Sequence, residues 1–168
     1  MSARPGRRLL AFGVDALVLA AWAGVVAAVG VPLHLAGVTG RMPPLALNAV
    51  GALLVVAPGV LGLAAAESRP AGTTPGKHAM GLVVRAADGG RLGFGRAAAR
   101  NALKVGLPWL VAHAAVIAVT APDPAPSAVL VGAYVVPAVW VATLFRGRGR
   151  TPYDRVAGSS VRRREVRS

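Results

Sequence analysis

Two ionisable residues in an apolar stretch near the N-terminus are the first candidates for chemistry. The stretch RRLLAFGVDALVLAAW, residues 7–22, contains Asp15 and, seven positions earlier, Arg8. On a helix, seven steps of about 100° return to nearly the same face, about 10 Å further along the axis. A carboxylate at the centre of a membrane-spanning helix costs roughly 2.5–3.5 kcal/mol to insert, so Asp15 needs a proton, a cation or a wet cavity. Two interpretations stay open: Asp15 binds an ion or a proton, or it forms a buried ion pair that fixes helix packing.

Three further side chains are candidate polar partners for Asp15. Arg100 and Lys104 lie four residues apart, hence on one helix face, where another apolar block begins. His113 lies inside that block, where it can hydrogen-bond between helices. The chain has no cysteine, and its three histidines lack the spacing of metal ligands. We therefore expect no metal site, no disulfide and no cofactor.

The sequence also lacks the residue patterns of common enzymes. No nucleophile–base pair and no phosphate-binding glycine loop has a usable spacing. The segment GGRLGFG, residues 89–95, does not have the strand–turn–helix context of a nucleotide-binding loop. We expect a protein without enzymatic activity.

The apolar residues that must position these side chains are grouped in four blocks. Of the 168 residues, 55% are hydrophobic and 15% are charged, against about 25% charged residues in ordinary globular proteins. The blocks are residues 9–31, 45–66, 102–121 and 128–145, each close to the roughly 20 residues that cross a bilayer. Residues 1–168 are thus expected to form one all-α membrane domain, a bundle of four transmembrane helices. The first block is longer than the roughly 7–15-residue core of a signal peptide, so we expect it to be retained.

The basic residues alternate with the apolar blocks. The net charge is +13, and the lysines and arginines gather before the first block, in the loop 67–101 and in the tail 146–168. In the two other connections, the one lysine or arginine is Arg41. By the positive-inside rule, both termini and the loop lie in the cytoplasm. The distribution therefore favours contact with anionic lipid head groups over nucleic-acid binding.

Two local patterns lie outside the blocks. Residues 79–85 and 91–94, on either side of the turn signal ADGG, predict a small cytoplasmic β-hairpin between the second and third spans. The run Thr151-Pro152-Tyr153-Asp154 is typical of a helix start, and Gly158 is a natural stop. We therefore expect a short amphipathic helix near the C-terminus.

Three segments together resemble the RDD family of bacterial membrane proteins. They are RRLLAFGVDALVL near the N-terminus, TTPGKHAMGLVVRAADGGRLGFGRAAARN in the centre and TPYDRVAGSSVRRR near the C-terminus. The family is named for an arginine and an aspartate in the first helix and a second aspartate later in the chain. These match Arg8, Asp15 and Asp154 by position, whereas Tyr153 stands where many relatives have histidine. That difference weakens the case for a histidine–aspartate pair that moves protons.

The resemblance implies a protein of the bacterial inner membrane and leaves two functions open. For the family, transport of unknown ligands is suggested, and cation/proton antiport is described for some members. In a small transporter or antiporter component, Asp15 would bind the ion or proton, Arg8 would tune its charge and Asp154 would form part of the cytoplasmic mouth. Because four spans are few for an aqueous path, such a protein is expected to be a homo-oligomer. The alternative is a non-transporting membrane scaffold or accessory subunit that binds anionic lipid or a protein partner.

Overall fold

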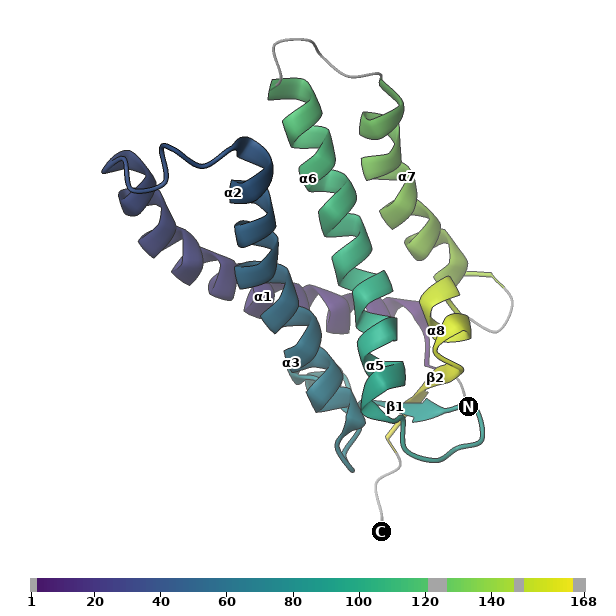
Figure 1. Cartoon of the computed structure of the whole chain (residues 1–168). Coiled ribbons are helices and arrows are strands. Elements are labelled where there is room, and N and C mark those ends of the chain that lie inside the picture. The colour runs from purple at the N-terminus through teal and green to yellow at the C-terminus, as the bar shows by residue number, and fades with distance from the viewer. Residues whose placement is uncertain (1–2, 121–126, 147–149, 165–168) are drawn as a thin grey trace.

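The computed structural model describes residues 3–120, 127–146 and 150–164, and these residues are mostly helical. Within them, the long helical runs are α1 (Pro5–Leu35); α2 (Pro44–Gly51), η1 (Ala52–Val56) and α3 (Ala57–Ser68) together; α5 (Phe94–Asn101), η2 (Ala102–Gly106) and α6 (Leu107–Thr120) together; and α7 (Ser127–Leu144). The short elements are α4 (Pro75–Ala79), β1 (Leu82–Ala86), α8 (Pro152–Val156) and β2 (Ser159–Arg163). The strands and α8 lie at one end of the molecule (Figure 1). We call this the sheet end.

Two of the long runs contain a π-helical turn just before a proline. Pro58 follows η1, and a second proline follows η2. A proline cannot donate to a carbonyl of the preceding turn, and the wider π turn relieves the clash of its ring with that turn. Trp22 Nε1 donates to Leu54 O (3.0 Å), and Trp140 Nε1 donates to Leu103 O (3.2 Å). The two indoles thus join neighbouring helices where the helical hydrogen-bonding is interrupted.

Much of the helical surface away from the sheet end is apolar. Within the described residues, two helices, Pro5–Leu35 and Leu45–Ser68, are long and apolar enough to cross a membrane, and Val131–Leu144 is a shorter apolar helix. Large apolar side chains on these helices are exposed, among them Leu17 and Leu53. Apolar surface of this extent needs cover from lipid or from another protein.

The buried core lies at the sheet end instead. α3 packs along α5, α4 packs against α1, and α6 stands beside α7. In Figure 1, α1 crosses behind these helices toward α8. The buried apolar cluster comes from the ends of these helices and from the sheet: Ala3, Ala11, Ala64, Leu82, Val84, Ala86, Leu92, Ala97 and Val161. A small core therefore fixes the helices at the end where the charged residues gather.

The two strands come from distant parts of the chain. β1 and β2 are antiparallel, with Leu82 opposite Arg163 and Ala86 opposite Ser159. Ala3 N donates to Val161 O (3.1 Å), so the N-terminal segment also joins this sheet. The sheet thus connects the beginning, the middle and the end of the chain.

The predicted hairpin between residues 79–85 and 91–94 is wrong in its second strand. Residues 91–93 form no strand, and Phe94 begins α5. The turn is present, since Ala86 N donates to Gly90 O (3.0 Å), but the chain then enters a helix. β2 takes the place of the missing strand because its Val161 can pair with Val84, and both side chains are buried.

The predicted C-terminal helix is present as α8. Thr151 has the extended backbone of an N-cap, and Pro152 occupies the first helical position. Thr151 N donates to Asp154 Oδ2 (3.3 Å), which is one half of a capping box. Tyr153 and Asp154 are buried, while Arg155 and Val156 are exposed.

Candidate functional site

Seven ionisable side chains meet in the interior at the sheet end. We call them the charge cluster: the carboxylates of Asp15, Glu67 and Asp154, and the cations of Arg8, Lys77, Arg100 and Lys104. No side chain of the cluster is more than 8% exposed. They come from α1, α3, α4, α5, η2 and α8, so the cluster joins nearly every element at this end. With all members ionised, four cations face three carboxylates, which leaves one positive charge in excess.

Asp15 attaches α1 to the segment before and within α4. Its Oδ2 accepts a hydrogen bond from Thr74 Oγ1 (2.7 Å), and its Oδ1 accepts one from Gly76 N (2.8 Å). Lys77 Nζ lies 3.6 Å from Oδ2, and Lys104 Nζ lies 4.0 Å from it. Both carboxylate oxygens are therefore already bonded to groups of the protein.

Gly76 permits this close approach of α4 to α1. A Cβ atom at Gly76 would lie 2.0 Å from Ala11 O and 2.9 Å from Asp15 Oδ1. Real Cβ atoms do not approach a backbone carbonyl so closely, and the Ala11 backbone inside α1 cannot move aside as a flexible side chain could. Only glycine fits at this point of contact.

Glu67, near the end of α3, connects three donors. Its Oε1 accepts from Arg100 Nη1 (2.6 Å) and Lys77 Nζ (2.8 Å), and its Oε2 accepts from Asn101 Nδ2 (2.9 Å). The side chain is fully buried. Sequence reasoning missed both Glu67 and Lys77. The available signal was an acidic residue at the end of an apolar block, which needs a cation once that end is buried.

Asp154 closes the cluster from α8. Arg8 Nη2 donates to its Oδ2 (2.5 Å), and Arg100 donates to its Oδ1 through Nε (3.0 Å). Burial raises the pKa of Asp154, but the charges of Arg100 and Arg8 lower it by more, so this pKa lies below its ordinary value. For Arg100, burial lowers the pKa, but the carboxylates of Glu67 and Asp154 raise it by more. Both groups stay charged at neutral pH.

The family model for the RDD family matches residues 2–159, nearly the whole chain. The chain belongs to the RDD family. No curated protein and no solved structure matches it. In this RDD protein, two of the three residues that match the family name are directly paired, Arg8 with Asp154. Asp15, although on the same face of α1 as Arg8, bonds instead to the segment around α4.

The structure brings some of the other sequence-predicted residues into the cluster of this RDD protein. Lys104 approaches Asp15, whereas Arg100 pairs with Glu67 and Asp154 and not with Asp15. His113 stands apart. Its ring stacks on Trp109 with the ring centroids 5.2 Å apart, and no contact among the described residues connects it to the cluster.

The cluster has little capacity for a metal ion. Within residues 3–120, 127–146 and 150–164, no group of three or more histidine, cysteine, aspartate or glutamate side chains is arranged to hold one. Each of the three carboxylates also accepts hydrogen bonds from basic or amide groups of the protein. A metal ion would have to displace those donors and would meet four nearby positive charges.

Proposed function

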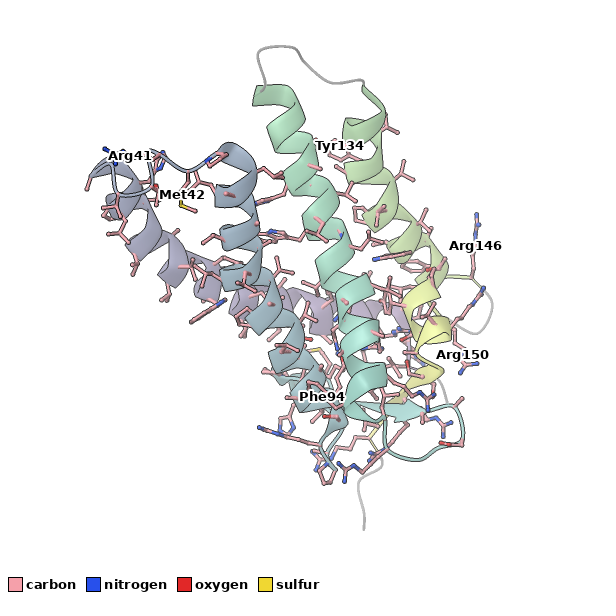
Figure 2. All side chains as sticks on the ribbon, viewed as in Figure 1. Arg41, Met42, Phe94, Tyr134, Arg146 and Arg150 are labelled. Atoms are coloured by element: carbon pink, nitrogen blue, oxygen red, sulfur yellow. The ribbon has the colours of Figure 1, made fainter. Side chains whose placement is uncertain are left out.

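We propose that this RDD protein is a multi-pass protein of the bacterial inner membrane with spans near residues 9–31, 45–66, 102–121 and 128–145. The two long apolar helices and the shorter Val131–Leu144 helix support this arrangement. The basic residues of the sheet end support a cytoplasmic position for it and for both chain termini. In Figure 2, Arg41 lies at the opposite end of the molecule, where the described residues carry few charges.

We further propose that it is a non-transporting membrane scaffold or accessory subunit that binds anionic lipid. The observation that carries this proposal is the state of Asp15, whose two oxygens already accept hydrogen bonds from Thr74 and Gly76. A transported cation would need this carboxylate. To bind there it would compete with both hydrogen bonds and would meet the ammonium groups of Lys77 and Lys104, 3.6 Å and 4.0 Å from Oδ2, which is unfavourable. The proposal assigns no enzymatic step to the chain.

The exposed basic residues support binding to anionic lipid. At the sheet end, nine arginines are exposed: Arg4, Arg7, Arg69, Arg91, Arg96, Arg146, Arg155, Arg163 and Arg164. A basic residue near an anionic membrane surface contributes about 1 kcal/mol of attraction. The exposed apolar helix faces, on the other hand, fit lipid chains, a second copy of the chain or a helix of another membrane protein.

Ion flux in proteoliposomes tests this proposal. The wild-type protein and the Asp15→Asn variant are reconstituted and exposed to sodium, potassium and proton gradients, and their thermal unfolding is followed separately. We expect no flux above that of empty liposomes for either protein, and a lower melting temperature for the variant. Flux through the wild type that disappears in a folded Asp15→Asn variant would refute the proposal and support the antiporter.

A second experiment tests the lipid. Nanodiscs of phosphatidylcholine are compared with nanodiscs containing phosphatidylglycerol at two salt concentrations. We expect a higher melting temperature with phosphatidylglycerol and a smaller difference at high salt, because salt screens exposed charges. Equal melting temperatures in both lipids would contradict the lipid-binding part of the proposal.

A further inference from the structure

A cavity of about 400 Å³ lies beside the charge cluster. Its walls are apolar and come from α1, α6 and α7, with Phe12, Pro108 and Trp140 among them. Its volume falls within the roughly 300–1,000 Å³ of small-molecule sites. At the sheet end the cavity reaches the charge cluster, so one end is polar and the rest is apolar.

The charges at this end of the cavity have one sign. All four cations of the charge cluster line it: Arg8, Lys77, Arg100 and Lys104. The three carboxylates of the cluster are not among its lining residues, because they lie behind the cations and bond to them. The cavity therefore has a positive end, although the cluster as a whole is almost balanced.

Two donors that line the cavity make no hydrogen bond within the described residues. Lys104 is 93% buried, since only 7% of its side chain is exposed, and its Nζ donates no hydrogen bond to any described residue. Its ammonium lies 4.0 Å from Asp15 Oδ2 and 5.0 Å from the centroid of the Phe12 ring. Trp109 Nε1 is also buried, and it has no hydrogen-bond partner in the described part of the chain. Buried donors are normally satisfied, so the indole N–H points to an acceptor that occupies the cavity. The Lys104 ammonium, whose ion pair with Asp15 is long, can donate to the same acceptor.

We propose that this cavity binds a single-chain anionic amphiphile. The phosphate or carboxylate head group accepts hydrogen bonds from Lys104 and Trp109, and the acyl chain packs against the apolar walls. A cation would be repelled by the four basic side chains, and an uncharged apolar molecule would leave both donors unpaired. The inference deepens the proposed function and rests on it, because it assigns the anionic lipid to a particular site.

Native mass spectrometry of the full chain in a neutral detergent tests the ligand. Lysophosphatidic acid is compared with lysophosphatidylcholine of the same chain, oleate with methyl oleate, and inorganic phosphate is tested alone. We expect the anionic amphiphiles to bind at least about tenfold more tightly than their uncharged or zwitterionic counterparts. Comparison of the affinities for lysophosphatidic acid and for oleate shows whether the site prefers a phosphate or a carboxylate head group. Equal binding within both pairs, or binding of inorganic phosphate as tight as that of lysophosphatidic acid, would overturn the inference.

Variants of the two donors test the site. Lys104→Met removes the charge at similar length, and we expect it to weaken the anionic ligand about tenfold while the zwitterionic ligand is unaffected. Trp109→Phe removes the indole N–H and is expected to have the same selective effect. The controls are Arg146→Met and Trp22→Phe, which do not line this cavity. Figure 2 shows the Arg146 side chain pointing away from the helices.

Two outcomes separate this inference from the proposed function. If Lys104→Met does not fold, Trp109→Phe and the cavity-filling Ala133→Phe decide, since Ala133 also lines the cavity. Unchanged binding in those two variants would overturn the inference. If the anionic amphiphile does not bind but phosphatidylglycerol still stabilises the protein and no flux is seen, the site is refuted and the proposed function stands. Flux that depends on Asp15 would refute the proposed function.

Discussion

The backbone amide of Gly76 donates a hydrogen bond of 2.8 Å to Asp15 Oδ1, a carboxylate that lies 61 residues earlier in the sequence. Thr74 Oγ1 donates to the other oxygen, so the two ends of one carboxylate connect α1 to the start of α4. A buried carboxylate that accepts hydrogen bonds from two donors restricts the position of both helices.

Gly76→Ala should disrupt this contact. The added Cβ would lie 2.0 Å from Ala11 O, so α4 must move away from α1 and the hydrogen bond to Asp15 is lost. We expect a loss of stability of about 1–3 kcal/mol or more, as for overpacked cores. Thermal unfolding in detergent measures it. Gly95→Ala is the matched control: its Cβ meets nothing within 4 Å, so this exposed helical position should be unchanged or slightly stabilised.

Glu67→Gln should destabilise the protein more than the same kind of substitution at an exposed carboxylate. The variant removes the negative charge with which the buried cations Lys77 and Arg100 are paired. Breaking a buried ion pair from one side costs about 3–5 kcal/mol. The control is Asp88→Asn, an exposed turn position where we expect about 0.5 kcal/mol or less. Equal melting temperatures for the two variants would contradict a central role of Glu67 in the cluster.

The stability contributed by Asp154 should depend on pH in one direction. Its folded pKa is lowered, so this contribution is fully present above the pKa of an unfolded aspartate, about 3.9, and is lost as the pH falls through the folded value. We therefore expect the difference in melting temperature between the wild type and Asp154→Asn to be constant from about pH 7 to pH 5 and to shrink below about pH 4. A melting-temperature difference that grows toward acid pH would contradict the lowered pKa of Asp154.

An engineered disulfide can test the pairing of β1 with β2, because the chain has no cysteine of its own. Arg85 and Ser160 are opposite each other in the antiparallel register. Opposite residues lie about 4.5–5.5 Å apart at Cα, within disulfide range. Arg85→Cys with Ser160→Cys should form a bond under mild oxidation, detected as a mobility shift that a reductant reverses. The control pair, Arg85→Cys with Arg162→Cys, is two residues out of register and should not cross-link efficiently.

The long helices could be predicted from the sequence because their signals are local. The predicted blocks 9–31 and 45–66 correspond to α1 and to the run from α2 to α3, and the block 128–145 corresponds to α7. A run of apolar residues and the length of a bilayer suffice for such predictions. The signal for the start of α8 is equally local, because the N-cap Thr151 and the first helical residue Pro152 are adjacent.

The sheet and most of the charge cluster depend on contacts that are distant in sequence. Arg8 and Asp154 are 146 residues apart, and the spacing of Arg8 and Asp15 indicated only a shared helix face. The strand β2 is difficult to recognise in the basic tail, because its buried positions, Ser159 and Val161, are close to several arginines in the sequence. A strand pattern of this length predicts a strand but does not identify the strand with which it pairs. The turn after β1 therefore suggested a local hairpin.

Asp154 follows every other member of the charge cluster in the sequence, and this limits the order in which the cluster can assemble. The four cations of the cluster are synthesised before it, so a chain that stops before α8 has those cations with only two carboxylates. In the same incomplete chain, the edge of β1 has no partner strand. The charge cluster therefore stays unbalanced until α8 has been synthesised, and the sheet stays incomplete until β2 follows. A chain truncated before α8 exposes both defects together at the sheet end.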